Sequence, residues 1–144
     1  QGQSIKWYII GYGSEEIERI VRDNAEKEGV SNNVIILGKK ENPYPYIKAC
    51  DIDVQPSRYE GKSITVREAQ ILCKPVIITN YPTAKSQVID GVDGIIVPMN
   101  IDECATQMAE FILNKKKQNE IIHYLETHDY GNETEVNKIY DLLR

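Results

Sequence analysis

The chain has 144 residues, of which 41% are hydrophobic and 27% charged, a size and composition typical of one globular domain rather than of a disordered protein. Its net charge of -5 argues against general nucleic-acid binding, which needs a clustered basic surface. No apolar stretch approaches the length of a membrane span, no signal-peptide pattern occurs, and Cys50, Cys73 and Cys104 have no metal-like spacing. These features predict a cytoplasmic protein with reduced cysteines.

The first elements follow the order strand, glycine turn, helix. Ile5 to Ile10 is a short apolar run that predicts a buried strand, and it ends in Gly11-Tyr12-Gly13. Ser14 is a suitable N-cap for a helix with apolar residues at helical spacing, which Gly29 can end. This order is typical of the start of a nucleotide-binding fold.

A dinucleotide cofactor is not favoured by this stretch. The third glycine of a Gly-x-Gly-x-x-Gly turn is absent, because Glu16 stands at its position. The strand predicted at Asn33 to Leu37 is followed by Gly38-Lys39-Lys40 rather than by the acidic residue that binds an adenosine ribose. The glycine turn is therefore expected either to bring backbone close to another nucleotide ligand or to serve only as a tight turn.

The rest of the chain continues the alternation of strands and helices. Further strands are predicted at Asp51 to Gln55, Pro75 to Thr79 and Gly94 to Val97, and helices at Tyr44 to Cys50, from Ser63, at Lys85 to Ile89, from an N-cap at Asp102, at Gln118 to Leu125 and after a break at Asp129 to Asn132. Alternating strands and helices imply parallel crossovers, so the sequence predicts an α/β fold, a Rossmann-like three-layer sandwich with one parallel sheet. A single domain is expected, with an α/β core over residues 1 to 126 and a C-terminal helix over 127 to 144.

The middle of the chain carries the most informative pattern. One carboxylate, Glu60, lies in a predicted loop, and a second, Glu68, lies in the helix that follows, with Gly61 between them. A carboxylate can accept hydrogen bonds from two vicinal hydroxyls, as acidic side chains do on ribose. The two carboxylates therefore suit a ligand that carries hydroxyl groups.

The start of this helix suits a phosphate. Backbone N–H groups in the first turn of a helix have no intrahelical partner and lie at the positive end of the helix dipole. Those of Ser63, Ile64 and Thr65 are therefore expected to bind phosphate oxygens, and Gly61 allows a ligand to approach the backbone closely. Phosphate between two carboxylates predicts a site for a nucleotide sugar.

This stretch resembles the signature of retaining glycosyltransferases of the GT-B fold, family 4 (glycosyl transferases group 1). The resemblance rests on Glu60, seven residues and then Glu68-Ala69, on Pro75-Val76-Ile77, and on Gly91-x-x-Gly94-x-x-x-Pro98, and it extends to Trp7 to Gly13 and Asn33 to Gly38. It implies that the chain is the C-terminal, donor-binding half of a GT-B fold. It also implies that Glu68 holds the donor ribose and that Glu60 is the catalytic carboxylate, which supports the transferred sugar by charge and hydrogen bonding.

The resemblance also implies a set of donor-binding residues. They are Gly61, Lys62, Ser63, Ile64, Thr65 and Glu68 in the middle of the chain, Gly11, Tyr12 and Gly13 in the first turn, and Lys39 and Lys40 as contacts to the base. Lys62 and Thr65 depart from the aromatic residue and proline that the family often has, and Lys62 is expected to add a positive charge. In the family, a basic pair and the N-terminal acceptor domain precede the strand that begins at Ile5. Nothing in Gln1 to Ser4 can replace that pair, so this chain alone is expected to bind nucleotide weakly and to transfer nothing.

The implied reaction is transfer of a sugar from a nucleotide sugar, with a UDP-sugar as the first expectation, to a saccharide or lipid-linked acceptor with retention, in bacterial cell-surface polysaccharide biosynthesis. No cofactor and no metal are expected, and Asp51 and Asp53 are interpreted as facing solvent or a sheet edge. The full protein is expected in the cytoplasm, with peripheral association at the inner face of the membrane left open. Two alternatives also stay open: a nucleotide-sugar epimerase of the same fold, and a nucleotide-binding module without chemistry.

Overall fold

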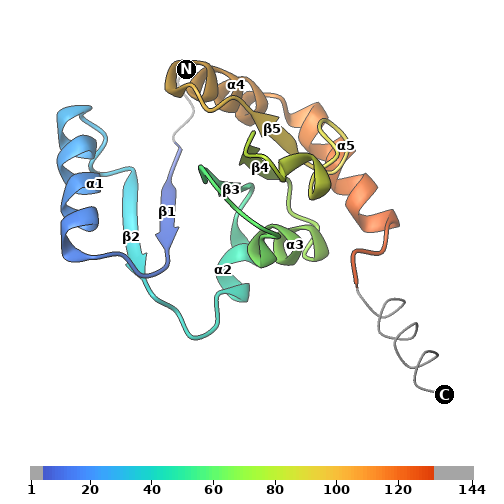
Figure 1. Ribbon diagram of the computed structural model, residues 1–144, viewed down its shortest axis with the longest axis horizontal. Coiled ribbons are helices and arrows are strands. Elements are labelled where there is room, and N and C mark those ends of the chain that lie inside the picture. Colours follow the sequence, from blue (N-terminus) through green and yellow to red (C-terminus); the bar gives the residue numbers. More distant parts are fainter. Residues whose placement is uncertain (1–4, 132–144) are drawn as a thin grey trace. The chain divides into compact units, whose positions relative to one another are not determined.

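The computed structural model describes residues 5–131, which contain five β-strands, five α-helices and one short 3-10 helix (Figure 1). The chain divides into two compact units, Gln1–Pro45 and Tyr46–Arg144. The α/β class with parallel strands is confirmed. The sequence predicted one sheet, and the structure has a two-stranded and a three-stranded parallel sheet, one in each unit. The helix expected after Asn132 lies outside the described residues.

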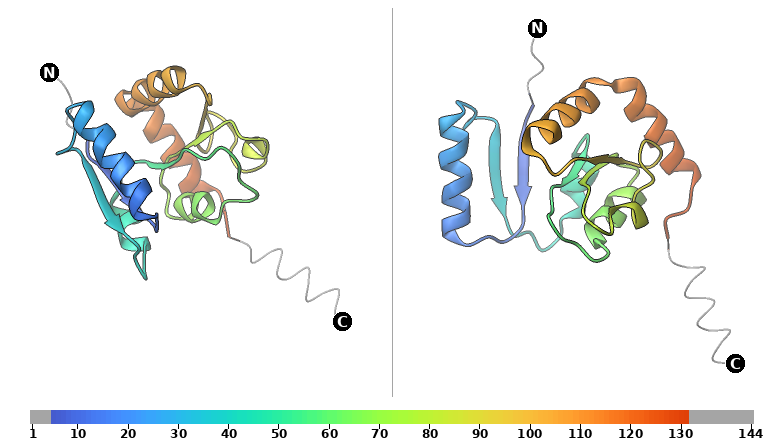
Figure 2. Two further views of the ribbon diagram at one scale, coloured as in Figure 1. Left: turned by 60° about the vertical axis from the view of Figure 1, so that its left-hand side comes forward. Right: turned by 45° about the horizontal axis from the view of Figure 1, so that its top comes forward.

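The first unit is a strand, helix, strand arrangement. β1 (Trp7–Ile10) pairs in parallel with β2 (Val34–Gly38), and α1 (Glu15–Lys27) connects them and runs alongside β2 (Figure 2). The hydroxyl of Ser14 accepts a hydrogen bond from the Ile17 N–H at 3.3 Å, which confirms the predicted N-cap. Strand and helix therefore begin and end close to where the sequence placed them.

The apolar face of α1 is only partly covered by this unit. The side chains of Ile17 and Ile20, which share the helical spacing of a core face, are 57% and 50% exposed, whereas Ala25 is buried. Two strands make a sheet about 10 Å wide, no wider than the helix with its side chains, so the outer apolar residues reach past it.

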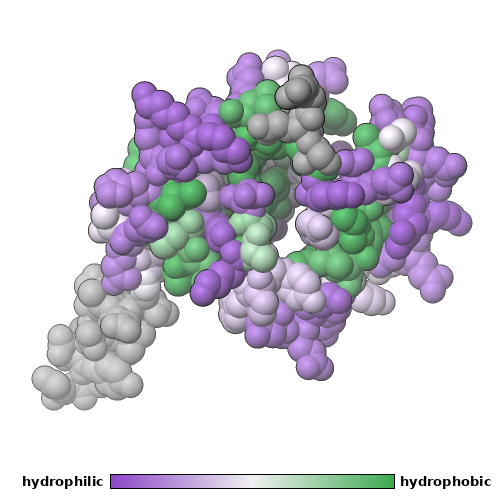
Figure 3. Space-filling model, turned by 180° about the vertical axis from the view of Figure 1, so that it is seen from behind, coloured by the Kyte–Doolittle hydropathy of each residue, from purple (hydrophilic) through white to green (hydrophobic). Residues whose placement is uncertain are grey.

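Seen from behind, the surface is largely hydrophilic, with separate apolar areas between the charged side chains (Figure 3).

The second unit has its sheet in the order β3 (Asp53–Gln55), β4 (Val76–Thr79), β5 (Ile95–Val97), with β4 in the centre. α3 (Ile64–Ile71) lies on one side of these strands, and α4 (Ile101–Leu113) and α5 (Lys115–Thr127) lie on the other (Figure 1). This unit therefore has the three layers that the sequence predicted.

The side chains of β4 separate two hydrophobic cores. Val76 and Ile78 pack with residues of α2 (Tyr44–Ala49), α3 and the 3-10 helix η1 (Ala84–Ser86), and Ile77 packs on the opposite face with α4 and α5. All three side chains have an exposed fraction of 0%. A strand buried on both faces is expected to be apolar throughout, as this one is.

The starts of the last two helices differ from the prediction. α4 is capped by Asn100, whose side-chain oxygen accepts from the N–H groups of Asp102 and Glu103 at 3.1 Å each, so Asp102, the predicted N-cap, lies in the first turn instead. Both side chains can cap a helix, and the backbone of Asn100 is extended while that of Asp102 is helical. α5 starts at Lys115, before the Gln118 of the prediction. None of the helices within residues 5–131 is long and apolar enough to cross a membrane.

Gly94 gives a test of this packing. A Cβ at this position would lie 2.5 Å from Val76 Cγ2, 2.9 Å from Val88 Cγ1 and 3.0 Å from the Val76 carbonyl oxygen. Gly94→Ala is expected to lower the free energy of unfolding by about 2 kcal/mol, because backbone and buried valines must move to admit the methyl group. Urea unfolding followed by circular dichroism measures this.

The matched control is Gly61→Ala, because a Cβ at Gly61 would meet no atom within 4 Å. Its free energy of unfolding is expected to stay within about 0.5 kcal/mol of the parent value. Equal unfolding midpoints for the two variants would contradict the close packing at Gly94.

Candidate functional site

The loop between β3 and α3 leaves the C-terminal edge of the three-stranded sheet and carries Glu60. Its first part is tied to the neighbouring strand, because the hydroxyl of Thr79 at the end of β4 donates to the Ser57 carbonyl. In an open parallel sheet, ligands bind beyond the carboxyl ends of the strands. The loop therefore lies where a ligand site is expected in this class of fold.

The Glu60 carboxylate is fixed by two neighbours on one of its oxygens. Oε1 accepts from the hydroxyl of Ser57 at 2.8 Å and from the side-chain amide of Gln55 at 3.1 Å. The other oxygen has no hydrogen-bond partner within residues 5–131, and the residue is half-buried. The carboxylate is thus held in one orientation and keeps an oxygen free for a ligand.

The backbone of the loop after Glu60 is held by two side chains from the segment that follows β4. The Thr83 hydroxyl donates to the carbonyls of Glu60 and Gly61 at 2.7 and 2.9 Å. Gln87 donates from Nε2 to the Gly61 carbonyl at 2.9 Å and accepts the Ser63 N–H at 2.7 Å. The Ser63 N–H, which the sequence placed among the phosphate-binding amides, is therefore already occupied.

Two backbone amides at the start of α3 stay free. The hydroxyl of Ser63 accepts the Val66 N–H at 3.4 Å, so Ser63 is the N-cap of the helix that the sequence predicted to begin near this residue. The N–H groups of Ile64 and Thr65 have no hydrogen-bond partner among the described residues, as the first turn of a helix requires. Lys62 precedes them, is exposed and makes no ion pair with any residue between 5 and 131. This end of the helix is positive and open to solvent.

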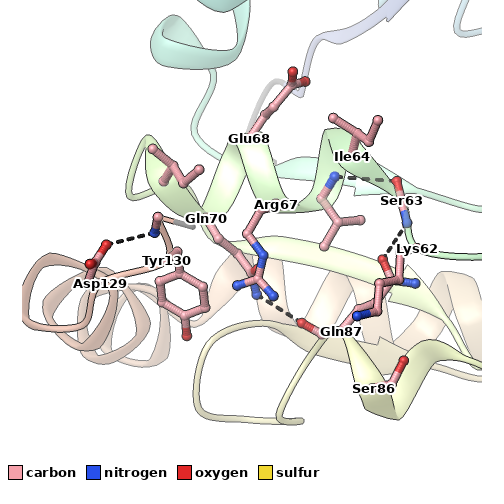
Figure 4. A pocket seen from close by; sticks show the side chains of 13 residues that line it. Lys62, Ser63, Ile64, Arg67, Glu68, Gln70, Ser86, Gln87, Asp129 and Tyr130 are labelled. Carbon is pink, nitrogen blue, oxygen red and sulfur yellow. Dashed lines mark hydrogen bonds between the residues drawn. The ribbon is translucent and has the colours of Figure 1, made fainter. Parts of the chain in front are cut away.

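Glu68 lies one turn further along α3, on the side away from Arg67 and Gln70 (Figure 4). It is half-buried, and its charge acts on Asp53 in β3. One oxygen of Asp53 is buried and has no hydrogen-bond partner in the part of the chain that the structure describes. Burial raises the pKa of the Asp53 carboxyl from 3.8 to about 6, and the negative charge of Glu68 contributes in the same direction.

Asp51 and Asp53 are interpreted from the sequence as facing solvent or a sheet edge; the edge position of β3 agrees with this, but the Asp53 carboxyl is partly buried and does not face open solvent. Asp51 is exposed and precedes the strand, which begins at Asp53. β3 is at the edge of the three-stranded sheet, but α3 packs against it and the Asp53 side chain is partly buried. No group of three or more acidic, histidine or cysteine side chains suited to a metal occurs in residues 5–131. The expectation of a metal-independent reaction stays a prediction.

α3 also borders a pocket of about 640 Å³, and Glu68 is among the residues that line it (Figure 4). Lys62, Arg67 and Gln87 line it together with Tyr130. The Arg67 guanidinium lies over the Tyr130 ring, 4.8 Å from its centre, and the Tyr130 hydroxyl donates to the buried Asp93 carboxylate at 2.7 Å. Burial, followed by the hydrogen bond to Asp93, raises the pKa of the Tyr130 hydroxyl. These contacts attach the chain after α5 both to α3, through Arg67, and to the segment before β5, through Asp93.

The residues predicted in the first unit lie together at one edge of its sheet. Gly11 follows β1 and donates its N–H to the carbonyl of Gly38, the last residue of β2, at 3.2 Å. The Gly11-Tyr12-Gly13 turn and Lys39-Lys40 therefore follow neighbouring strand ends, and Tyr12 is 89% exposed. That they share a ligand with Glu60 and Glu68 stays a prediction.

Sequence reasoning did not find Gln87, Thr83 or the buried state of Asp53. Gln87 is 24 residues from Ser63, in a segment predicted only as a short helix, and no local pattern marks it. Asp53 did carry a signal, because an acidic residue inside an otherwise apolar strand must face either solvent or a polar site.

Comparison with known sequences shows the family to which the chain is related. The sequence model of the family described as "Glycosyl transferases group 1" matches residues 1–128. The chain is 26% identical over 110 residues to "Putative glycosyltransferase EpsF" of Bacillus subtilis, which covers 76% of this chain and 28% of that protein. It is 28% identical over 123 residues to "Capsular polysaccharide biosynthesis glycosyltransferase CapM" of Staphylococcus aureus, covering 85% of this chain and 32% of that one. The chain thus spans about a third of the length of these relatives.

Among solved structures, the Anabaena protein Alr3699/HepE in complex with UDP superposes with a TM-score of 0.85 and 21% sequence identity over 96% of this chain and 40% of that chain. The same protein in complex with UDP-glucose superposes with a TM-score of 0.76 and 22% identity over 86% of this chain and 35% of that one. At this identity the likeness shows the fold.

The raised pKa of Asp53 predicts a pH dependence of stability. Between pH 4 and pH 6 the folded state holds a proton on Asp53 that the unfolded state has lost, so the free energy of unfolding falls as the pH rises through this window. Asp53→Asn removes the buried charge and is expected to flatten this dependence and to raise the free energy of unfolding at pH 8 by about 2 kcal/mol. Urea unfolding at pH 4, 6 and 8 measures both effects.

Asp51→Asn is the matched control, because the Asp51 side chain is exposed two residues away. The free energy of unfolding of this variant is expected to change with pH in parallel with that of the parent chain. A parallel profile for Asp53→Asn as well would mean that the Asp53 carboxyl is solvated and not buried.

Proposed function

The chain belongs to the family glycosyl transferases group 1, and we propose that it forms the donor-binding part of a glycosyltransferase that uses a UDP-sugar. The observation that carries this proposal is the start of α3. Two backbone amides without a partner among residues 5–131 lie there, in a short stretch of chain between Glu60 and Glu68. This arrangement offers donors to an anion and acceptors to hydroxyl groups within one loop and one helix turn.

The diphosphate is assigned to the amides of Ile64 and Thr65. They point out of the positive end of α3 and can donate to phosphate oxygens without first losing an intramolecular bond. The exposed Lys62 adds a mobile positive charge beside them. As the bond to the sugar breaks, negative charge grows on the leaving diphosphate, and fixed donors of this kind stabilise it without rearrangement.

The two carboxylates are assigned to the hydroxyl groups of the donor. Glu68 would accept from the ribose, because an ionised carboxylate takes both vicinal hydroxyls and the residue is oriented away from the Arg67 side of α3. Glu60 would lie beside the transferred sugar with its free oxygen, while Ser57 and Gln55 hold the other. A charge fixed next to the anomeric carbon supports positive charge that develops there in the transition state.

The choice of UDP and the biological setting rest on the relatives. The structurally similar HepE is in complex with UDP and with UDP-glucose, and CapM is named for capsular polysaccharide biosynthesis. We therefore propose a saccharide or lipid-linked acceptor in polysaccharide biosynthesis and, from the family resemblance, transfer with retention of configuration and without a metal. Because the chain spans about a third of its relatives, the acceptor site and the complete reaction belong to this proposal as well.

The test is a titration of the chain with UDP followed by backbone amide NMR shifts. UDP is expected to shift the amides of Ile64 and Thr65, and Glu68→Gln is expected to raise the Kd about tenfold, the value of one hydrogen bond to a charged group. With 2′-deoxy-UDP the penalty of Glu68→Gln is expected to be smaller, because one of the two hydroxyls is gone.

Glu110→Gln, an exposed carboxylate on α4, is the matched control and is expected to leave both affinities unchanged. The proposal is refuted if saturating UDP leaves the amides between residues 60 and 68 unshifted, or if Glu68→Gln weakens UDP and 2′-deoxy-UDP by the same factor.

A further inference from the structure

Gln87 bridges the two ends of the glycine loop that precedes α3. Its side chain has an exposed fraction of 8% and makes hydrogen bonds with both of its polar atoms. Oε1 accepts the Ser63 N–H at 2.7 Å, and Nε2 donates to the Gly61 carbonyl at 2.9 Å and lies 3.3 Å from the Tyr81 hydroxyl. One planar amide therefore fixes the peptide groups on both sides of Lys62.

The bridge needs an amide in particular. Asparagine and glutamine side chains offer a hydrogen-bond donor and an acceptor side by side in one plane without titrating, and glutamine has the longer reach. A glutamate could accept the Ser63 N–H, but it would place a charge against the Gly61 carbonyl oxygen. A methionine of similar size could do neither. Substitution of Gln87 by glutamate or methionine thus changes the hydrogen-bonding groups of the side chain while its volume stays nearly the same.

Gln87 is itself held by buried groups. Gln70 of α3, with an exposed fraction of 1%, donates from Nε2 to the Gln87 carbonyl at 3.3 Å (Figure 4). Tyr81, whose hydroxyl oxygen accepts a hydrogen bond from Gln87 Nε2, also has an exposed fraction of 1%. Hydrogen bonds to both its backbone carbonyl and its side chain hold Gln87 in one orientation inside the packed core. The loop residues that bind its amide are therefore fixed in position as well.

We infer that Gln87 is a positioning residue for the diphosphate of the donor. By taking the Ser63 N–H and the Gly61 carbonyl, it directs the next two amides, those of Ile64 and Thr65, outward and keeps the carbonyl from facing the anion. The inference rests on the proposed function, since it names the residue that shapes the phosphate loop. Gln87 touches no part of the donor itself and acts through the loop backbone.

The experiment compares UDP with uridine on the complete chain, using amide NMR shifts to obtain both Kd values. Gln87→Met is expected to raise the Kd for UDP about tenfold, the value of one charge-assisted hydrogen bond, and to leave the Kd for uridine within a factor of two. Gln87→Glu retains the acceptor for the Ser63 N–H but places a negative charge against the Gly61 carbonyl and near the anion, so it is expected to raise the Kd for UDP at least as much as Gln87→Met does, and again to leave uridine within a factor of two. Gln107→Met, at an exposed position of α4, is the matched control.

A purely structural role predicts another result. If Gln87 only stabilises the fold, its variants lower the urea midpoint but leave the ratio of the uridine and UDP Kd values unchanged, and this outcome overturns the inference. The expected fall in that ratio, in variants whose amide spectra show a folded chain, supports it.

Hydrogen exchange separates this inference from the proposed function. If UDP shifts no amide of the parent chain, the proposed function fails, and the role of Gln87 is then decided by the Ser63 amide. Exchange at Ser63 that is at least about tenfold faster in Gln87→Met than in the parent, with altered Ile64 and Thr65 amide shifts, supports control of the loop by Gln87. Equal exchange rates overturn it.

Discussion

The buried strand β4 is the constraint on which the second unit depends. Its three isoleucine and valine side chains alternate between two cores, Val76 and Ile78 toward α3 and Ile77 toward α4 and α5, and all are inaccessible to solvent. Because both faces are filled, the helices on either side are fixed relative to the sheet. The first turn of α3 is therefore held at the carboxyl edge of the strands, where its free amides can meet a ligand.

The site combines opposite charges over a short distance along the chain. The start of α3 and Lys62 are positive, and Glu60, Glu68 and Asp53 are negative when ionised. This separation suits a ligand with an anionic diphosphate in the middle and neutral hydroxyl-bearing sugars on both sides. The unsatisfied oxygen of Asp53 next to Glu68 costs stability at neutral pH, which is the kind of cost that proteins carry at functional sites.

Local sequence signals predicted the helix starts well where the stabilising hydrogen bond joins residues only a few positions apart. Ser14 and Ser63 are N-caps in the structure, because a cap needs only its own side chain and an N–H two or three residues later. The same rule predicted Asp102 as the cap of α4 and was wrong, since Asn100 can cap as well and only the backbone conformation distinguishes the two. The spacing of Glu60 and Glu68 could likewise be read directly, because it follows the chain.

The sequence by itself determined the α/β class, the order of the strands and helices between residues 5 and 131, and the loop and helix that carry the two carboxylates. The tertiary structure alone decided which amides are free, because the Ser63 N–H is taken by a side chain 24 residues away. It also decided that Asp53 is partly buried and acts with Glu68, since α3 must first pack on β3. Periodicity and capping are local properties, whereas desolvation and hydrogen bonding between distant residues exist only after the chain has packed.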